Sequence, residues 1–469
     1  MRRNRSRFDK ESLREPTVAL LSILAFCSIF ASWYPVRNGP AIDFYQFWVV
    51  GQEISAGEPG SIYSDSVRKD IGRRFLQQAR TSRDYARLRT ARERSTLDTY
   101  STPFLYSAFS FFSSGDYPRD LLVYRALSLL CLIFSVTVLC RLLDYGLAAT
   151  LVAIILFACW FAPSISELTV GNVNHFQLAS LVLFLWLSRR FPTTKGQFAG
   201  GFLLGLGALF KPNTAVVIAM LAAAWFVSRQ YRKLFAEMAG VGTGALVAFI
   251  GSSLSFGRTG IWLDWLAALS ELPDHLITVE LGNYAPGRLL GDALGFDGTG
   301  WIALACGGLA LVAIVKGLGR PAASSANADR SIPGAQGLED MIVVALAGIA
   351  TLLSSPLSWL HYFVAAIPML LITLRPLRPL RPLRPVAHSQ ATRPEGHAEL
   401  AWTISRGVAI VALPVVMIRP LVMLGVGEPR DRAILLCLAI AALFVLGLRE
   451  LSDLSGNPAE EPEESPHGV

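Results

Sequence analysis

The feature that most limits the fold of this chain is the repetition of apolar segments long enough to cross a membrane. A helix needs roughly 17 to 25 predominantly apolar residues to span the hydrocarbon core. Of the 469 residues, 52% are hydrophobic and 16% are charged, which does not suit soluble cores under a polar surface. The sequence therefore predicts an all-α polytopic membrane protein with about 10–12 transmembrane or re-entrant helices. The apolar segments cover residues 17–33, 121–140, 146–161, 176–187, 198–227, 234–256, 301–315, 341–354, 362–374, 408–424 and 433–448.

Lys and Arg residues between these segments predict the orientation of the chain, because short cytoplasmic loops are enriched in positive charge. The N-terminal residues 1–16 are basic, and so are the connections at 189–195, 229–233, 316–320 and 375–384. We therefore place these stretches in the cytoplasm. The formal charge of +7 then reflects membrane topology, and no nucleic-acid partner is expected.

The segment 198–227 begins and ends next to cytoplasmic charge, yet Lys211-Pro212-Asn213 interrupts it. Proline removes a backbone donor and stops a helix. The segment is either a hairpin of two half-length helices with the Lys-Pro break at its tip or one long kinked helix. We favour the hairpin, because the later loops then alternate correctly between the two sides.

The predicted organisation is a cytoplasmic N-terminus (1–16), a membrane domain (17–450) and a disordered cytoplasmic tail (451–469). Within the membrane domain, residues 317–340 and 375–405 are cytoplasmic linkers. Residues 35–103 form an outer loop that carries helices, and 163–175, 257–300 and 355–361 also face outward. A basic helix predicted over 64–95 is either amphipathic on lipid headgroups or an ordinary solvated helix.

Three residues in or next to the apolar segments are candidates for the chemistry. Asp43 follows the first span among aromatic residues, as a general base or as the N-cap of the next helix. Lys211 inside an apolar segment is costly unless it faces phosphate, a carboxylate or water, or extends to the interface. His361, beside Trp359, lies at the outer end of a span, as a catalyst or as a hydrogen-bonded structural group.

The turn between the third and fourth spans is a further candidate. It contains one acid, two amides and a histidine, a set that suits sugar hydroxyls, although Gly and Asn are also what a tight turn needs. These residues are Glu167, Asn172, Asn174 and His175. The six cysteines show no metal-ligand spacing, so neither a metal nor another cofactor is expected.

Several of these segments together resemble glycosyltransferase family 87. The resemblance rests on Asp43 after the first span, Gly60-Ser61-Ile62-Tyr63, Tyr100-Ser101-Thr102-Pro103-Phe104, Thr169-Val170-Gly171-Asn172-Val173-Asn174, Gly205 to Lys211-Pro212, and Ser355-Pro356-Leu357-Ser358-Trp359-Leu360-His361-Tyr362. Relatives usually have Gly-Gln-x-Asn where this chain has Gly171-Asn172-Val173-Asn174, and the Arg-rich stretch after Tyr63 is longer than the family pattern.

The resemblance implies a GT-C type fold and inverting sugar transfer at the outer leaflet. The family includes an actinobacterial mannosyltransferase that uses polyprenol-phosphate-mannose. Carried over by motif, the family's first-loop aspartate is Asp43 as base, its Lys-Pro lysine is Lys211, and its Ser-Trp-x-His histidine is His361.

The sequence thus predicts a membrane hexosyltransferase of the cell envelope, with mannose as the favoured sugar, in a bacterial plasma (inner) membrane and with its active site facing outward. Its partners would be a polyprenyl-phosphate sugar donor, membrane lipids, and a glycolipid or glycan acceptor. The alternative is a transporter or flippase of lipid-linked saccharides. The predicted catalytic residues are Asp43 and His361, and the residues predicted to bind donor phosphate or sugar are Lys211, Asn172, Asn174, Glu167, His175 and Trp359.

Overall fold

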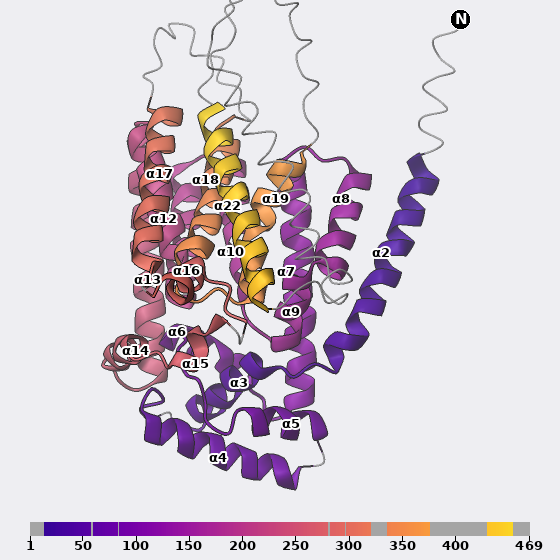
Figure 1. Cartoon of the computed structure of the whole chain (residues 1–469), viewed down its shortest axis with the longest axis vertical. Helices are drawn as coiled ribbons and strands as arrows, with labels where there is room; N and C mark the ends of the chain where they lie inside the picture. Colours follow the sequence, from indigo (N-terminus) through magenta and orange to yellow (C-terminus); the bar gives the residue numbers. More distant parts are fainter. Residues whose placement is uncertain are drawn as a thin grey trace, which may run out of the picture.

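The computed structural model describes residues 14–57, 60–82, 84–279, 282–295, 297–319, 335–375 and 429–453. Most of the basic N-terminus, much of both cytoplasmic linkers, the predicted span at 408–424 and nearly all of the predicted tail lie outside the described residues. The described parts are helical, and a single isolated bridge pairs Asn283 with Trp359. The prediction of an all-α fold is confirmed (Figure 1).

The helices follow one another as a bundle with a smaller cap of short helices at one end (Figure 1). The N-terminal part and the cap are formed by α2 (Arg14–Arg37), α3 (Ile42–Ser55), α4 (Asp65–Thr81), α5 (Tyr85–Glu93), α6 (Pro103–Phe109) and η1 (Ser110–Phe112). The bundle continues with α7 (Tyr117–Leu142), α8 (Leu147–Ile155), η2 (Leu156–Trp160), α9 (Ala162–Val170), α10 (Asn174–Arg190), α11 (Thr194–Phe210), α12 (Thr214–Val227) and α13 (Tyr231–Ser255). The rest comprises α14 (Ile261–Ser270), α15 (Asp274–Ile277), α16 (Pro286–Leu294), α17 (Thr299–Leu318), α18 (Ala335–Ser354), η5 (Leu360–Ala366), α19 (Ile367–Leu374) and α22 (Pro429–Asp453).

Six helices in the described part of the chain are long and apolar enough to cross a membrane, namely those at 16–34, 117–142, 231–255, 299–318, 337–354 and 431–452. The pair α9 and α10 is also apolar enough but bends by 118° at the turn between them, as in a broken span or a re-entrant loop. The predicted spans at 146–161, 198–227 and 362–374 are shorter apolar helices or pairs of them. The protein is therefore a polytopic membrane protein in which several expected spans are broken or short.

The α11–α12 segment folds back on itself, as the hairpin interpretation requires. The start of α11 and the end of α12 line the same pocket, and Arg232 after α12 donates a hydrogen bond to Thr194 of α11 (3.1 Å). Lys211 ends α11 at the other end, where Pro212 and Asn213 lead into α12. A proline that cannot continue the helix thus places one lysine at the tip of the hairpin.

α11 packs against α13 without side chains between them. A Cβ added to Gly201 or Gly205 would lie 2.0–2.1 Å from backbone oxygens of α13. A Cβ at Gly240 or Gly244 of α13 would lie 2.2 Å from backbone oxygens of α11. Small residues spaced four apart let helix backbones touch in this way in membranes.

The described residues form two main hydrophobic cores. The larger is formed mostly by aliphatic residues of α7, α10, α12, α18 and α22. The smaller core lies under the cap and is rich in aromatic rings, for example Phe44 against Tyr124 (centroids 4.9 Å apart) and Phe47 against Phe109 (4.8 Å). Each such pair stabilises by roughly 0.5–1.5 kcal/mol beyond area burial. This aromatic core fixes α3 in place.

The basic helix predicted over 64–95 is two helices: α4 ends at Thr81, and Asp84 caps the start of α5 by accepting from the N–H of Ala86 (3.0 Å). Its apolar face is covered by protein: Phe75 of α4 packs edge-on against Trp48 of α3 at 6.0 Å. The structure therefore favours the solvated-helix interpretation over an apolar face laid into lipid.

Candidate active site

Asp43 lies in the first turn of α3 but does not cap it. Ala41 occupies the N-cap position, and no side chain caps this end. The cap interpretation of Asp43 is therefore wrong. One carboxylate oxygen instead accepts a hydrogen bond from the amide nitrogen of Asn172 (2.8 Å) and lies 3.8 Å from Nε2 of His361. The other oxygen lies 3.8 Å from the guanidinium of Arg94.

The turn between α9 and α10 brings Asn172 to Asp43. Gly171 adopts φ +75°, and a Cβ there would lie 2.5 Å from Cβ of Phe44. Only glycine satisfies both the left-handed backbone and this close approach. The side-chain oxygen of Asn172 accepts from the backbone N–H of Val173 (2.8 Å), which leaves its NH₂ group directed at Asp43.

Glu167 and His175 are placed behind this turn and not in the cavity. The Glu167 carboxylate, fully buried, accepts from the side-chain amide of Asn174 (2.6 Å) and from the backbone N–H of His175 (3.4 Å). The buried His175 ring makes a 2.9 Å hydrogen bond to Ser128 through Nδ1. Neither residue lines the cavity: Glu167 is hydrogen-bonded within the turn, whereas His175 bonds to Ser128 of α7 and its buried Nε2 has no hydrogen-bond partner within the described ranges. Their predicted contact with sugar stays a prediction.

Lys211 turns its ammonium group inward from the tip of the α11–α12 hairpin. Its Nζ donates to the side-chain oxygen of Asn174, lies 3.5 Å from that of Asn172, and sits 4.3 Å from the centre of the Tyr362 ring. The ammonium therefore does not extend along the outer surface. It orients both amides of the turn and adds a positive charge behind Asn172.

His361 is held in the short helix η5 after a segment that Asn283 fixes. The fully buried Asn283 side chain donates to the carbonyl of Pro356 (2.9 Å) and accepts from the N–H of Ser358 (2.8 Å). The His361 ring packs edge-on against Tyr362, with centroids 4.8 Å apart. The bend in the chain before η5 thus directs the imidazole toward Asp43.

These segments enclose a cavity of about 460 Å³. Asp43, Asn172, Trp359 and His361 line it, whereas Lys211, Glu167, Asn174 and His175 do not. The walls come from α3, the stretch between α5 and α6, the α9–α10 turn, the region around α15, and η5. Polar groups far apart in the sequence therefore converge on one cavity. Two of the elements that contribute to it, α3 and α15, lie at the cap end of the bundle (Figure 1).

Arg94 is a cavity residue that the sequence did not single out. It pairs with Asp98 and reaches Asp43, and both partners also line the cavity. In the sequence it is one of many arginines in the stretch 64–95. Only its contact with Asp43, 51 residues away, distinguishes it from the others.

Arg125 is a second residue that the sequence did not single out. Its guanidinium donates to the carbonyls of Leu168 (3.0 Å) and Gly39 (3.0 Å), and so connects the residues just before α3 to α9.

Burial in the cavity wall raises the pKa of the Asp43 carboxyl above its ordinary value. Arg94, the Asn172 hydrogen bond and Lys211 act in the opposite direction, and Asp98 adds to the rise. A raised pKa makes a carboxylate a stronger base once it is ionised. A base, a histidine and two nearby cations around a small cavity can take a proton and stabilise a departing anion.

The bundle and the enclosed polar site together define an all-α polytopic membrane protein with a candidate active site beside its cap. Residues 99–331 match the family model described as glycosyltransferase family 87, and the chain belongs to this family of membrane glycosyltransferases. The matched region contains Asn172 and Lys211, and the fold brings Asp43 and His361 from outside it against these residues. Neither the curated proteins nor the solved structures contain a match to the chain.

Proposed function

We propose that this glycosyltransferase moves a hexosyl group, with mannose the favoured sugar, from a polyprenyl-phosphate donor to a glycolipid or glycan acceptor. The observation that carries the proposal is the position of Asp43 in the cavity wall, where it contacts Asn172 and lies near both His361 and Arg94. The family resemblance described from the sequence supports the donor class.

In the proposed reaction, Asp43 accepts the proton of the acceptor hydroxyl as its oxygen attacks the anomeric carbon. The new carbon–oxygen bond forms on the face opposite the phosphate, so the configuration inverts. The bond from the anomeric carbon to the phosphate oxygen breaks, and the electron pair leaves on the polyprenyl phosphate. No oxidant, reductant or further reactant is required.

Two cations are available to the departing phosphate. Arg94 is the better placed, because it lines the cavity, although it also pairs with Asp98. Lys211 lies behind the side-chain amides of Asn172 and Asn174 and orients both. Its positive charge would reach the phosphate only through these amides. His361 is 3.8 Å from Asp43, too far for a hydrogen bond, and would orient the donor or acceptor between them.

The distribution of charge supports an outward-facing site. Arg189, Lys195, Arg229 and Arg232 gather at the end of the bundle opposite the cap, separated from the α9–α10 turn by the length of α10, about 25 Å. Positive charge in short loops marks the cytoplasmic side. The cations of α4 and α5 belong to a long connection between spans, which escapes this bias.

The test is transfer by the purified protein in sealed vesicles given radiolabelled polyprenyl-phosphate-mannose and a panel of glycolipid acceptors. We expect a labelled glycolipid whose new linkage has the configuration opposite to that of the donor. Movement of the labelled donor across the vesicle wall without any product would instead identify a transporter or flippase. Product with another sugar donor but not with mannose would overturn the sugar assignment alone.

A further inference from the structure

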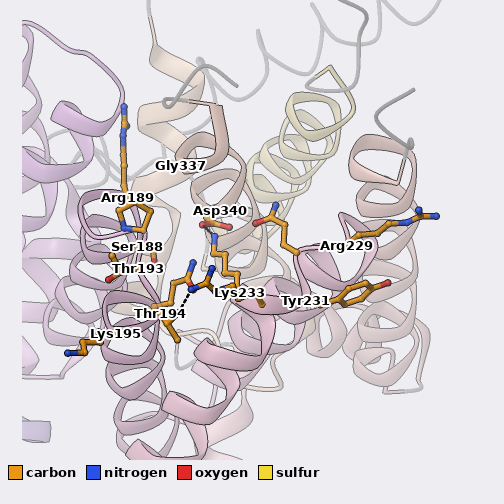
Figure 2. A pocket seen from close by; sticks show the side chains of 14 residues that line it. Ser188, Arg189, Thr193, Thr194, Lys195, Arg229, Tyr231, Lys233, Gly337 and Asp340 are labelled. Atoms are coloured by element: carbon orange, nitrogen blue, oxygen red, sulfur yellow. Dashed lines mark hydrogen bonds and ion pairs between the residues drawn. The ribbon is translucent and has the colours of Figure 1, made fainter. Parts of the chain in front are cut away.

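A second, larger pocket lies at the end of the bundle opposite Asp43. Its volume is about 920 Å³, and it opens between the α10–α11 connection, the α12–α13 connection and the start of α18 (Figure 2). No residue of the proposed reaction lines it. Its lining is dominated by cations: Arg189, Lys195, Arg229, Arg232 and Lys233 face a single lining carboxylate, Asp340. The pocket walls therefore carry a formal excess of four positive charges.

Contacts within the protein use only part of this charge. Lys233 pairs with Asp340, Arg232 binds the Thr194 hydroxyl (3.1 Å), and Arg189 donates to the carbonyl of Leu142 (2.9 Å). Among the described residues, the side chains of Lys195 and Arg229 have no hydrogen-bond or ion-pair partner. Both are exposed and stand at opposite edges of the pocket, with Lys233 and Asp340 between them (Figure 2).

Helix ends add to the positive potential. α11, α13 and α18 all begin at this pocket, and the N-terminus of a helix carries a partial positive charge and unpaired N–H groups. α10 and α12 end here, and the residues at their ends include Arg190 and Arg229, which offset the carbonyl dipole. Glu237 is fully buried beneath Ser188 (3.1 Å) and does not line the pocket.

The backbone of Arg229 closes α12 and sets the position of this side chain at the edge of the pocket. Arg229 has φ +58°, a left-handed conformation that glycine adopts without strain. Its N–H bonds to the carbonyl of Phe226 (3.1 Å), and the next N–H, of Gln230, to that of Trp225 (2.8 Å), which closes α12. A long charged side chain occupies a turn position where no side chain is favoured.

The surface beside the pocket is aromatic and exposed. Tyr231 on the rim is 46% exposed and packs against the exposed Phe226, with ring centroids 5.8 Å apart. Phe235, one turn further along α13, is also exposed. Aromatic side chains gather at the membrane–water interface, between headgroups and acyl chains. A phosphate in the pocket would therefore lie next to a surface suited to acyl chains, an arrangement that a free soluble anion does not need.

We infer that this pocket binds the phosphate headgroup of an anionic membrane lipid. The phosphate lies against Arg232 and the N-terminal amides of α11, the edge cations Lys195 and Arg229 add positive potential from either side, and the acyl chains lie on the aromatic surface around Tyr231. This site is independent of sugar transfer.

The test is native mass spectrometry of the purified protein titrated with phosphatidylglycerol or phosphatidylcholine. We expect one tightly retained phosphatidylglycerol, and binding at least about tenfold weaker in Lys195→Gln/Arg229→Gln/Arg232→Gln, because each cation near the headgroup layer contributes to anionic-lipid affinity. The matched control is Arg73→Gln/Arg80→Gln/Arg92→Gln, which removes the same charge from exposed positions on α4 and α5. It should bind as the wild type does.

Three results would overturn the inference. They are equal retention of the two lipids by the wild type, unchanged phosphatidylglycerol binding in the triple variant, and equal loss in the control. Inorganic phosphate, titrated without lipid, provides the second arm: binding as tight as that of phosphatidylglycerol would assign the pocket to a soluble anion. Melting temperatures of all variants separate lost binding from lost folding.

Discussion

The two ends of the bundle use positive charge differently. At the cap end, Arg94 and Lys211 both have partners: Asp43 and Asp98 for the arginine, and the Asn172 and Asn174 amides for the lysine. At the opposite end, five cations line a pocket with one carboxylate. A network of paired charges fixes geometry for chemistry, whereas an excess of positive charge retains affinity for an anion from outside.

The largest effect is expected from removing the proposed base, Asp43, at the cap end. Asp43→Asn keeps the size of the side chain, and its oxygen can still accept from Asn172. We expect the fold and donor affinity to persist and turnover to fall about 100- to 10,000-fold, the usual range for loss of a general base. Single-turnover kinetics and donor titration measure the two effects. A rate above a tenth of the wild-type rate contradicts the assignment, and Asp65→Asn, an exposed acid at the same end, is the control.

The second test asks whether the cap end depends on close backbone contact. Gly171→Ala forces an alanine into φ +75° and places its Cβ against Phe44, so the turn must shift. We expect a cost of about 2–4 kcal/mol from the left-handed backbone and the overpacking together, with reduced turnover because Asn172 moves away from Asp43. Thermal unfolding in detergent and transfer rate are the measurements. Gly242→Ala, in a helix with open space around it, should be neutral or slightly stabilising; equal behaviour of the two variants would refute the requirement.

The smallest expected effect concerns pH. Burial raises the pKa of Asp43, so the acid limb of the rate profile lies above the ordinary aspartate range, and activity is lost as the pH falls through that raised value. Arg94 opposes the rise. Arg94→Gln should therefore move the acid limb to higher pH by about one unit. Arg94→Lys keeps the positive charge, so its acid limb should lie closer to that of the wild type.

Profiles of kcat/KM against pH for the three proteins measure this effect. Arg89→Gln, at an exposed position on α5 just before Arg94, should leave the acid limb in place. A downward or absent shift in Arg94→Gln would show that the guanidinium does not stabilise the Asp43 carboxylate.

Much of the bundle was predictable because apolar length is a local property. The predicted segments at 121–140 and 234–256 correspond to α7 and α13, and the Lys211-Pro212 break marks the tip of the α11–α12 hairpin. The shorter apolar helices were harder to predict. α9 and α10, for example, bend by 118°, and composition alone does not reveal a bend.

The candidate site was predictable only in part. Asp43, Asn172 and His361 stood out because each is polar at the edge of an apolar run. Glu167 and His175 met the same criterion, but no local pattern tells which side of a turn faces a cavity. Arg94 and Asn283 depend on contacts with partners 51 and about 73 residues away, so their sequence neighbourhoods carried no signal. The shorter amide of Asn172 still reaches Asp43, because Gly171 allows the two backbones to approach.

The contact between α11 and α13 has a mechanical consequence. With backbone against backbone at four glycines, neither helix can roll about its own axis without collision, so the two must move as one rigid strut. Lys211 stands at one tip of this strut, and Lys195 and Arg232 stand near its other end. Any tilt of the strut therefore displaces the charge at both ends of the bundle at once.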